Sequence, residues 1–304
     1  MNLYNTYRPQ SLDQIKGNAD IVSTLQSMLS DINTCPHSFL LHGPTGCGKT
    51  TIGRIIAKNL DCHGSDFREV DSADFRGIDT VREIRKNSQF MPMEGANRVW
   101  LIDECHKMTN DAQNALLKIL EDSPPHVFFI LCTTDPQKLL PTIKGRCSSF
   151  QVSLLTDPQM FSLLRKIARD EGETLEQEIY DQILDTSQGK PRNAIVILEQ
   201  VLNAKPEQRL EISKRTADNQ AQIIDLCRAL LKGGAWKQVN TILEGIKDQE
   251  PESIRRVVLG YCQAVLLKSE NDRAAAIIEQ FWEPTYDIGF PYITYACYCI
   301  TKSK

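Results

Sequence analysis

One glycine-rich segment constrains the fold of this chain more than any other feature of the sequence. Residues 43–50 read Gly-Pro-Thr-Gly-Cys-Gly-Lys-Thr and fit the phosphate-binding pattern G-x-x-x-x-G-K-[ST]. An apolar run from Phe39 to His42, typical of a buried strand, precedes the segment, and a helical pattern from Thr50 to Leu60 follows it. A loop of this kind between a strand and a helix predicts a parallel α/β sheet that binds the phosphates of a nucleotide.

Each residue type in this loop has an expected role in phosphate binding. The glycines let the backbone wrap around the phosphates with N–H groups pointing inward, and the following helix adds its positive end. Lys49 is predicted to contact the β- and γ-phosphates, and the Thr50 hydroxyl to hold Mg²⁺. A glycine-rich turn with a solvated lysine is the alternative, but the complete motif and its flanking elements disfavour it. The predicted nucleotide-binding residues of the loop are Gly43, Pro44, Thr45, Gly46, Cys47, Gly48, Lys49, Thr50 and Thr51.

The order of apolar and amphipathic stretches predicts three domains. Up to about Phe150, short apolar runs alternate with helical patterns, which implies a parallel sheet covered on both faces. Beyond Phe150 the strand signal disappears, and a break in the helical patterns falls near Lys205-Pro206-Glu207. We therefore expect an α/β phosphate-binding domain at 1–152, a small helical lid domain at 153–205 and an all-helical domain at 206–304.

The individual elements follow from the same patterns. Besides Phe39 to His42, strands are expected at Arg68 to Val70, Val99 to Ile102 and Val127 to Leu131. Besides Thr50 to Leu60, helices are expected at Thr80 to Ser88, Asn110 to Glu121, Pro158 to Glu171, Glu176 to Ser187, Pro191 to Asn203, Gln222 to Lys232, Trp236 to Ile246, Pro251 to Lys268, Asp272 to Trp282 and Tyr292 to Ile300.

Two acidic residues close one of the expected strands. Asp103 and Glu104 directly follow the apolar run Val99 to Ile102. An isolated Asp-Glu pair is usually a solvated turn, but this pair lies about fifty residues after a phosphate-binding loop. Asp103 is then expected to reach Mg²⁺, and Glu104 to activate the attacking water as a general base. The pair therefore predicts hydrolysis of ATP as well as binding.

Composition limits the compartment and the kinds of partner. The sequence contains no run of about 18 uncharged apolar residues, and its start does not resemble a secretion signal. The ten cysteines are scattered singly, and Cys297-Tyr298-Cys299 lacks further ligands for zinc. We therefore expect a cytoplasmic protein with no membrane partner. With a net charge of −4, any nucleic-acid contact must come from a local patch or from a surface assembled by several subunits.

Several motifs together resemble the AAA+ ATPase subunits of sliding-clamp loaders. The run Thr133 to Lys138 is similar to bacterial DNA polymerase III gamma/tau, whereas Asp71 to Asp79 is similar to the small subunits of replication factor C. The chain lacks the cysteine-rich zinc insertion of gamma/tau, and a virus or mobile element could carry so compact a version. The resemblance spans about residues 4 to 200 and implies an AAA+ domain, a lid with the sensor 2 motif and a helical collar. Its motifs are Tyr7-Arg8-Pro9, the phosphate-binding loop, Asp103-Glu104-Cys105-His106, the helix Asn110 to Glu121, Thr133-Thr134-Asp135-Pro136-Gln137-Lys138 and Gly145-Arg146-Cys147.

The resemblance implies roles for further residues around the nucleotide. Arg8, together with backbone near Tyr4 and Lys16, would cradle the adenine. Thr134 would be sensor 1, placed to sense the γ-phosphate, although Thr-Thr-Asp-Pro is also a good turn sequence. Arg192, which follows Gly189-Lys190-Pro191, would be sensor 2, with an exposed helix arginine as the alternative.

The resemblance also implies contacts with a neighbouring subunit and with DNA. Arg146 would be the arginine finger that reaches the ATP of the adjacent subunit, although Gly145 replaces the serine of the family's Ser-Arg-Cys motif. Residues at the start of one helix would track DNA phosphates without reading sequence, the alternative being a solvated helix face of mixed charge. The implied DNA-binding residues are Arg76, Gly77, Ile78 and Arg82.

Together these features predict an ATPase subunit of a clamp loader, which opens a sliding clamp and loads it on primer–template DNA. The expected cofactors are ATP and Mg²⁺. The expected partners are other clamp-loader subunits in a pentameric ring, the clamp and the DNA. The alternatives are an AAA+ helicase or branch-migration motor and an ATP-binding scaffold subunit, and the scaffold is disfavoured because Lys49, Glu104, Thr134 and Arg192 are all intact. The predicted catalytic residues are Lys49, Glu104, Thr134 and Arg146.

Overall fold

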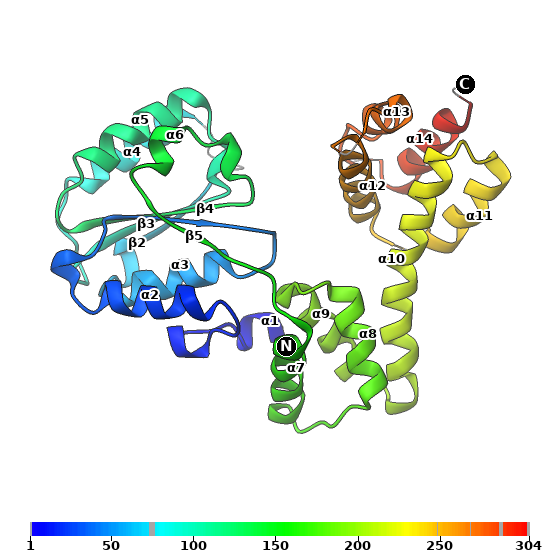
Figure 1. Ribbon diagram of the computed structural model, residues 1–304, viewed down its shortest axis with the longest axis horizontal. Coiled ribbons are helices and arrows are strands. Elements are labelled where there is room, and N and C mark those ends of the chain that lie inside the picture. Colours follow the sequence, from blue (N-terminus) through cyan, green and yellow to red (C-terminus); the bar gives the residue numbers. More distant parts are fainter. Residues whose placement is uncertain (1, 73–76, 248, 268, 286–287, 303–304) are drawn as a thin grey trace. The chain divides into compact units, whose positions relative to one another are not determined.

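A five-stranded parallel sheet organises the first half of the chain. Its strand order is β2-β3-β4-β1-β5 (Figure 1), and all four pairings are parallel. The central strands β1, β3 and β4 are buried along nearly their whole length, as strands covered on both faces must be. The predicted α/β architecture is therefore confirmed. The strands are β1 (Ser38–His42), β2 (Phe67–Asp71), β3 (Arg98–Asp103), β4 (Val127–Thr133) and β5 (Ser148–Gln151).

Helices cover both faces of the sheet. One face carries α2 (Ala19–Leu29) and α3 (Lys49–Asn59), and the other carries α4 (Ile78–Ser88), α5 (Asn110–Glu121) and the short α6 (Pro141–Lys144) (Figure 1). Successive residues of a strand point to opposite faces. Accordingly, Phe39 and Leu41 pack in the core beneath α2 and α3, whereas Leu40 packs in the core beneath α4 and α5.

Three helices follow the sheet, and we call them the lid helices: α7 (Asp157–Asp170), α8 (Gln177–Ser187) and α9 (Pro191–Leu202). The short N-terminal helix α1 (Leu3–Thr6) contacts α9. Just after α1, the Tyr7 hydroxyl donates a hydrogen bond of 2.6 Å to Glu171 at the end of α7, and this bond raises the pKa of Tyr7 to about 12. The start of the chain is therefore fastened to the lid helices.

The C-terminal region consists of helices around a separate core. Its helices are α10 (Arg209–Leu231), α11 (Trp236–Ile246), α12 (Pro251–Leu266), α13 (Asp272–Gln280) and α14 (Phe290–Lys302). The core contains Leu226, Val258 and Phe281, all fully buried. The all-helical prediction holds, but α10 begins at Arg209 rather than at Gln222, so the predicted helix start was too late.

The structure, a computed structural model, describes residues 2–72, 77–247, 249–267, 269–285 and 288–302. The chain divides into two compact units, Met1–Asn203 and Ala204–Lys304. A further boundary between residues 152 and 153 stays a prediction, supported by the end of the sheet at Gln151 and the helices that follow. Within the described ranges, no helix combines the length and the apolar character needed to cross a membrane.

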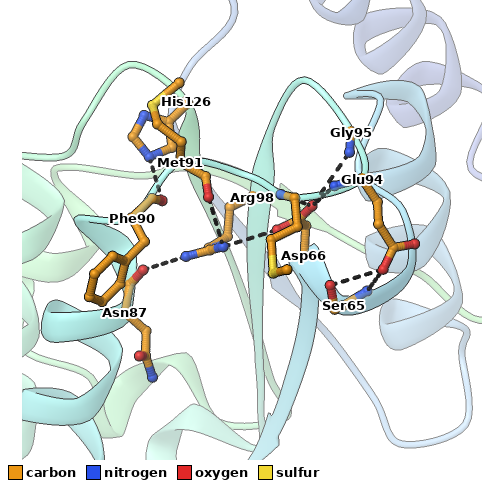
Figure 2. Close-up of polar contacts among 10 residues, drawn as sticks. Ser65, Asp66, Asn87, Phe90, Met91, Glu94, Gly95, Arg98 and His126 are labelled. Carbon is orange, nitrogen blue, oxygen red and sulfur yellow. Dashed lines mark hydrogen bonds and ion pairs between the residues drawn. The ribbon is translucent and has the colours of Figure 1, made fainter.

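A buried ion pair anchors the amino end of β3 (Figure 2). Arg98 opens the strand and lies 3.0 Å from Asp66, whose side chain is fully buried. The other carboxylate oxygen of Asp66 accepts backbone N–H groups of Met93 and Glu94, each at 2.7 Å. Arg98 also donates to the Met91 carbonyl at 3.2 Å. The pair therefore fixes the loop that leads into β3.

Candidate nucleotide-binding site

The candidate site lies where the central strands end. His42, the last residue of β1, is paired in register with Thr133, the last residue of β4. Strand β3 ends at Asp103 on the far side of β4. Because parallel strands end at the same edge of a sheet, the phosphate-binding loop, the acidic pair and Thr134 share one edge.

The backbone of the loop requires glycine at its first position. Gly43 has a φ of +147°, and a Cβ atom there would lie 2.1 Å from the Val152 carbonyl oxygen. The loop thus passes directly against the chain that follows β5, and a larger residue would displace it. At the other end of the loop, Gly48 adopts a φ of +104° immediately before α3 begins.

Lys49 is folded back onto its own loop. Its side chain is almost completely buried, and its ammonium donates to the carbonyls of Gly43 at 3.0 Å and Pro44 at 2.8 Å. These neutral oxygens satisfy a buried cation. A phosphate would offer it a stronger, charge-assisted acceptor.

Thr50 and Asp103, the two predicted Mg²⁺ ligands, lie side by side. The Thr50 hydroxyl donates to one oxygen of Asp103 at 2.7 Å, and the other oxygen accepts the backbone N–H of Glu104 at 2.9 Å. A hydroxyl and a carboxylate side by side fit Mg²⁺, which favours a few protein oxygens together with waters and substrate phosphates.

Glu104 is held in a strained and partly exposed position. Its φ is +48°, a left-handed conformation that is uncommon for a residue other than glycine. Its carboxylate lies 3.3 Å from the Thr134 hydroxyl and 3.3 Å from the His106 ring. The predicted base and the predicted sensor 1 are therefore in contact.

His106 is a member of this site for which the sequence predicts no role. Its Nδ1 also lies 3.0 Å from the Thr133 hydroxyl, so it bridges the ends of β3 and β4. Burial lowers the pKa of His106, and the negative charge of Glu104 opposes this only in part. The available signal was its position in Asp103-Glu104-Cys105-His106.

A cavity of about 440 Å³ opens beside these groups, a volume within the range of small-molecule sites. Its lining includes Lys49 and Glu104. Lys49 is hydrogen-bonded to Gly43 and Pro44, and Glu104 to Thr134, and these three partners lie just outside the lining. The predicted site residues that line it are Tyr4, Arg8, Lys16, Thr45, Gly46, Cys47, Gly48, Lys49, Thr50, Thr51, Asp103, Glu104 and Arg192.

Two arginines flank the ring of Tyr4 at the edge of the cavity. The Arg8 and Arg192 guanidinium carbons lie 4.8 and 5.0 Å from the ring centroid, and Arg192 donates a hydrogen bond of 3.1 Å to the phenol oxygen. Burial alone would raise the pKa of Tyr4, but the hydrogen bond from Arg192 and the charges of both arginines bring it below its ordinary value. The family resemblance implies a role only for the backbone near Tyr4, so the contacts of its side chain are a new finding.

Arg146 lies outside the cavity lining. It forms an ion pair with Glu121 at the end of α5 and donates to the Thr142 carbonyl at 3.1 Å. Its side chain is 37% exposed. Its role as an arginine finger stays a prediction.

The predicted DNA-binding residues gather at the start of α4. Gly77 precedes the helix and Ile78 is its first residue, while Arg82 pairs with Asp79 at 2.8 Å in an exposed ion pair. Arg76 lies outside the described residues. The role of this turn in DNA binding stays a prediction.

The sequence and the fold are similar to those of known proteins. Residues 65–156 match the family model for the DNA polymerase III delta subunit. DNA polymerase III subunit gamma/tau of Mycobacterium tuberculosis is 35% identical over 225 residues, which cover 66% of this chain and 39% of the relative. Subunit tau of Bacillus subtilis is 30% identical over 307 residues, covering 91% of this chain and 54% of the relative.

Among solved structures, the Thermotoga maritima RuvB Holliday junction branch migration motor superposes with a TM-score of 0.61. It is 19% identical, and the match covers 78% of this chain and 85% of RuvB. A likeness at this identity shows a shared fold alone. The chain spans 39% of the Mycobacterium tuberculosis relative and 54% of the Bacillus subtilis relative. It spans 61% of a third relative, the DNA polymerase III subunit gamma of Buchnera aphidicola.

Proposed function

Because this chain belongs to the clamp-loader family of AAA+ ATPases, we propose that it binds and hydrolyses ATP as one subunit of a ring that loads a sliding clamp on primer–template DNA. The observation that carries the proposal is the series of hydrogen bonds from Thr50 through Asp103 and Glu104 to Thr134 beside the cavity. It joins a candidate metal site, a candidate base and a candidate phosphate sensor in one place.

The phosphate end of the site would act first in binding. Lys49 would exchange its two carbonyl partners for the β- and γ-phosphates, since an anion is the stronger acceptor. Thr50 and Asp103 would hold Mg²⁺, which when bound supplies positive charge against the phosphate oxygens. Arg8, Tyr4 and Lys16 line the cavity and would enclose the adenine and ribose.

Glu104 would then act on water. A general base must be within hydrogen-bond reach of the water it deprotonates, and both contacts of Glu104 are long, at 3.3 Å. The carboxylate can therefore turn toward a water next to the γ-phosphate at small cost. Thr134 would report the phosphate to Glu104 because their side chains touch, and Arg146 would complete the site of an adjacent subunit.

The branch-migration motor receives no specific support from the fold. The likeness to RuvB rests on 19% identity, whereas the gamma/tau and tau relatives reach 30–35%. A scaffold without hydrolysis is disfavoured by the intact contact between Glu104 and Thr134.

The test is to co-express the chain with the sliding clamp and other replication proteins of its source and to measure ATP hydrolysis. We expect turnover to rise when clamp and primed DNA are both present. Lys49→Ala should abolish it, whereas Lys58→Ala, a matched change near the other end of α3, should leave it unchanged. The motor would be favoured instead if ATP hydrolysis did not respond to clamp and primed DNA but was coupled to branch migration of four-way junctions.

A further inference from the structure

The environment of Arg192 differs from that expected of a free phosphate sensor. Its side chain leaves the backbone beside the phosphate-binding loop, since a Cβ atom on Gly46 would lie 3.7 Å from the Arg192 Cβ. Its guanidinium, however, lies against the Tyr4 ring and donates to the phenol oxygen at 3.1 Å. Tyr4 is 188 residues away in sequence, so the contact joins α1 to the start of α9.

Lys49 and Arg192 have partners of the same kind. Lys49 is expected to meet the phosphates, Arg192 starts beside the same phosphate-binding loop, and both line the cavity. Lys49 is bonded to two carbonyls of its own loop, and Arg192 to a phenol. In each case a neutral oxygen holds the cation, and a phosphate anion would form a shorter, stronger bond. Such partners are suited to exchange.

We propose that Tyr4 is a positioning residue for Arg192, and that its hydroxyl competes with the terminal phosphate of ATP for this guanidinium. The inference rests on the proposed ATP binding and deepens it. ADP lacks the terminal phosphate that would bind the Arg192 guanidinium. Only the binding of ATP therefore requires the hydrogen bond between Arg192 and Tyr4 to break. The hydroxyl of Tyr4 therefore lowers the preference of the site for ATP over ADP.

The ring and the hydroxyl of Tyr4 have separable effects. The ring keeps its contacts with the Arg8 and Arg192 guanidinium groups when the hydroxyl is removed, because cation–π attraction comes from the aromatic face. Tyr4→Phe thus removes the competitor and leaves the packing of α1 in place. Tyr7→Phe is the matched control, since it removes the other phenol that ties this segment to the lid helices, through Glu171.

The experiment measures the dissociation constants of ATPγS and ADP by calorimetry on the full chain with Mg²⁺. We expect Tyr4→Phe to tighten ATPγS binding by about threefold to tenfold, the value of one hydrogen bond, and to change ADP binding by less than about twofold. Tyr7→Phe should leave the ratio of the two constants as in the wild type. In an Arg192→Gln background, Tyr4→Phe should no longer change the ratio.

Three results would overturn the inference: weaker ATPγS binding in Tyr4→Phe, equal changes for both nucleotides, or an effect that persists without Arg192. If the wild type binds ATPγS well and Tyr4→Phe leaves the ratio unchanged, the inference fails while the proposed function stands. If the wild type binds neither nucleotide, the proposed function fails and the inference fails with it.

Discussion

Strand β3 has charged groups at both ends, and they differ in how completely their polar atoms are bonded. At the amino end, the Arg98 side chain is 10% exposed and that of Asp66 is fully buried. Both oxygens of Asp66 have close partners, two of them at 2.7 Å (Figure 2). At the carboxyl end, the Glu104 side chain is 29% exposed and its contacts are 3.3 Å long.

The difference shows how one strand can serve both stability and chemistry. A buried charge without partners is costly, so a saturated pair such as Arg98 and Asp66 has one stable arrangement. The carboxylate contacts of Glu104 are long and its backbone is strained, so its side chain can change partners when a ligand binds. We infer that the amino end fixes the loop and the carboxyl end binds the ligand. Substitutions at the two ends of β3 should therefore have different effects.

The largest effect is expected from Arg146, which would supply positive charge to the site at the carboxyl end of β3 in a neighbouring subunit. Arg146→Ala should lower the rate of ATP hydrolysis by roughly 10³-fold or more, with a much smaller change in ATP affinity. The decisive measurement mixes Arg146→Ala chains with Lys49→Ala chains, each inactive alone. Some junctions in mixed rings would have an intact loop on one side and an intact arginine on the other, and activity should return in part. Mixed rings that form but stay inactive at every ratio would count against action in trans.

Glu104→Gln should slow hydrolysis by about 10²- to 10⁴-fold, the usual contribution of a general base. ATP binding should persist because Lys49, Thr50 and Asp103 remain. Glu94→Gln is the matched control at the amino end, where Glu94 accepts hydrogen bonds from Ser65. Single-turnover rates and nucleotide affinities measured for both variants test the assignment, and a Glu104→Gln variant with the wild-type rate would remove Glu104 from the chemistry.

Asp66→Ala should reduce the free energy of unfolding by about 3–5 kcal/mol, because it leaves Arg98 buried without its counter-ion. Glu69→Ala is the control. It breaks the Arg54–Glu69 pair, whose side chains are 40% and 32% exposed, and should cost less than about 1 kcal/mol. Urea unfolding followed by circular dichroism compares the two, and similar losses would show that the buried pair has no special role.

The same carboxylate predicts a pH dependence. Burial alone would raise the pKa of Asp66, but the backbone N–H groups and Arg98 lower it below its ordinary value. A lowered folded-state pKa gives stability that is present above the unfolded-state pKa of about 3.9 and is lost as pH falls through the folded-state value. The wild type should therefore lose its advantage over Asp66→Asn as pH falls below about 4. A stability difference that stays constant down to about pH 2 would contradict this.

The sheet and the phosphate-binding end of the site could be predicted because their signals are local. Apolar runs mark β1, β3 and β4, and eight consecutive residues define the loop. Strand β5 was missed, since Ser148–Gln151 contains two serines and depends on pairing with β1. The early start of α10 was missed because the sequence from Arg209 to Ala221 is largely polar and shows little amphipathic pattern.

Contacts between distant residues could not be predicted from any single segment. Tyr4 meets Arg192 only because α1 packs against α9. Asp66 sits in a short connecting turn and Arg98 opens a buried strand, so neither has a local motif that announces a buried pair. Both contacts depend on side chains that tertiary packing brings together, whereas a motif reflects only residues that are close in sequence.

The smallest effect is predicted for a residue of helix α4. Arg82 lies near the start of this helix, and near its end the Asn87 carbonyl accepts a hydrogen bond from Arg98 at the amino end of β3 (Figure 2). The Arg82–Asp79 pair has side-chain exposures of 68% and 88%, and such a pair is worth less than about 1 kcal/mol. A DNA phosphate can therefore replace Asp79 with little loss.

Each phosphate contact releases counterions, so removing one lowers the slope of log affinity against log salt by about 0.9. We expect this change for Arg82→Ala and about twice the change when Arg76→Ala is added, with primed-DNA affinity reduced equally for unrelated sequences. Arg68→Ala, which removes an exposed arginine of β2 near the other end of the sheet, should leave the slope unchanged. Salt titrations of the assembled ring measure all three variants. If Arg68→Ala flattened the slope as much as Arg82→Ala, general charge loss would explain the effect, and the start of α4 would not be a DNA contact.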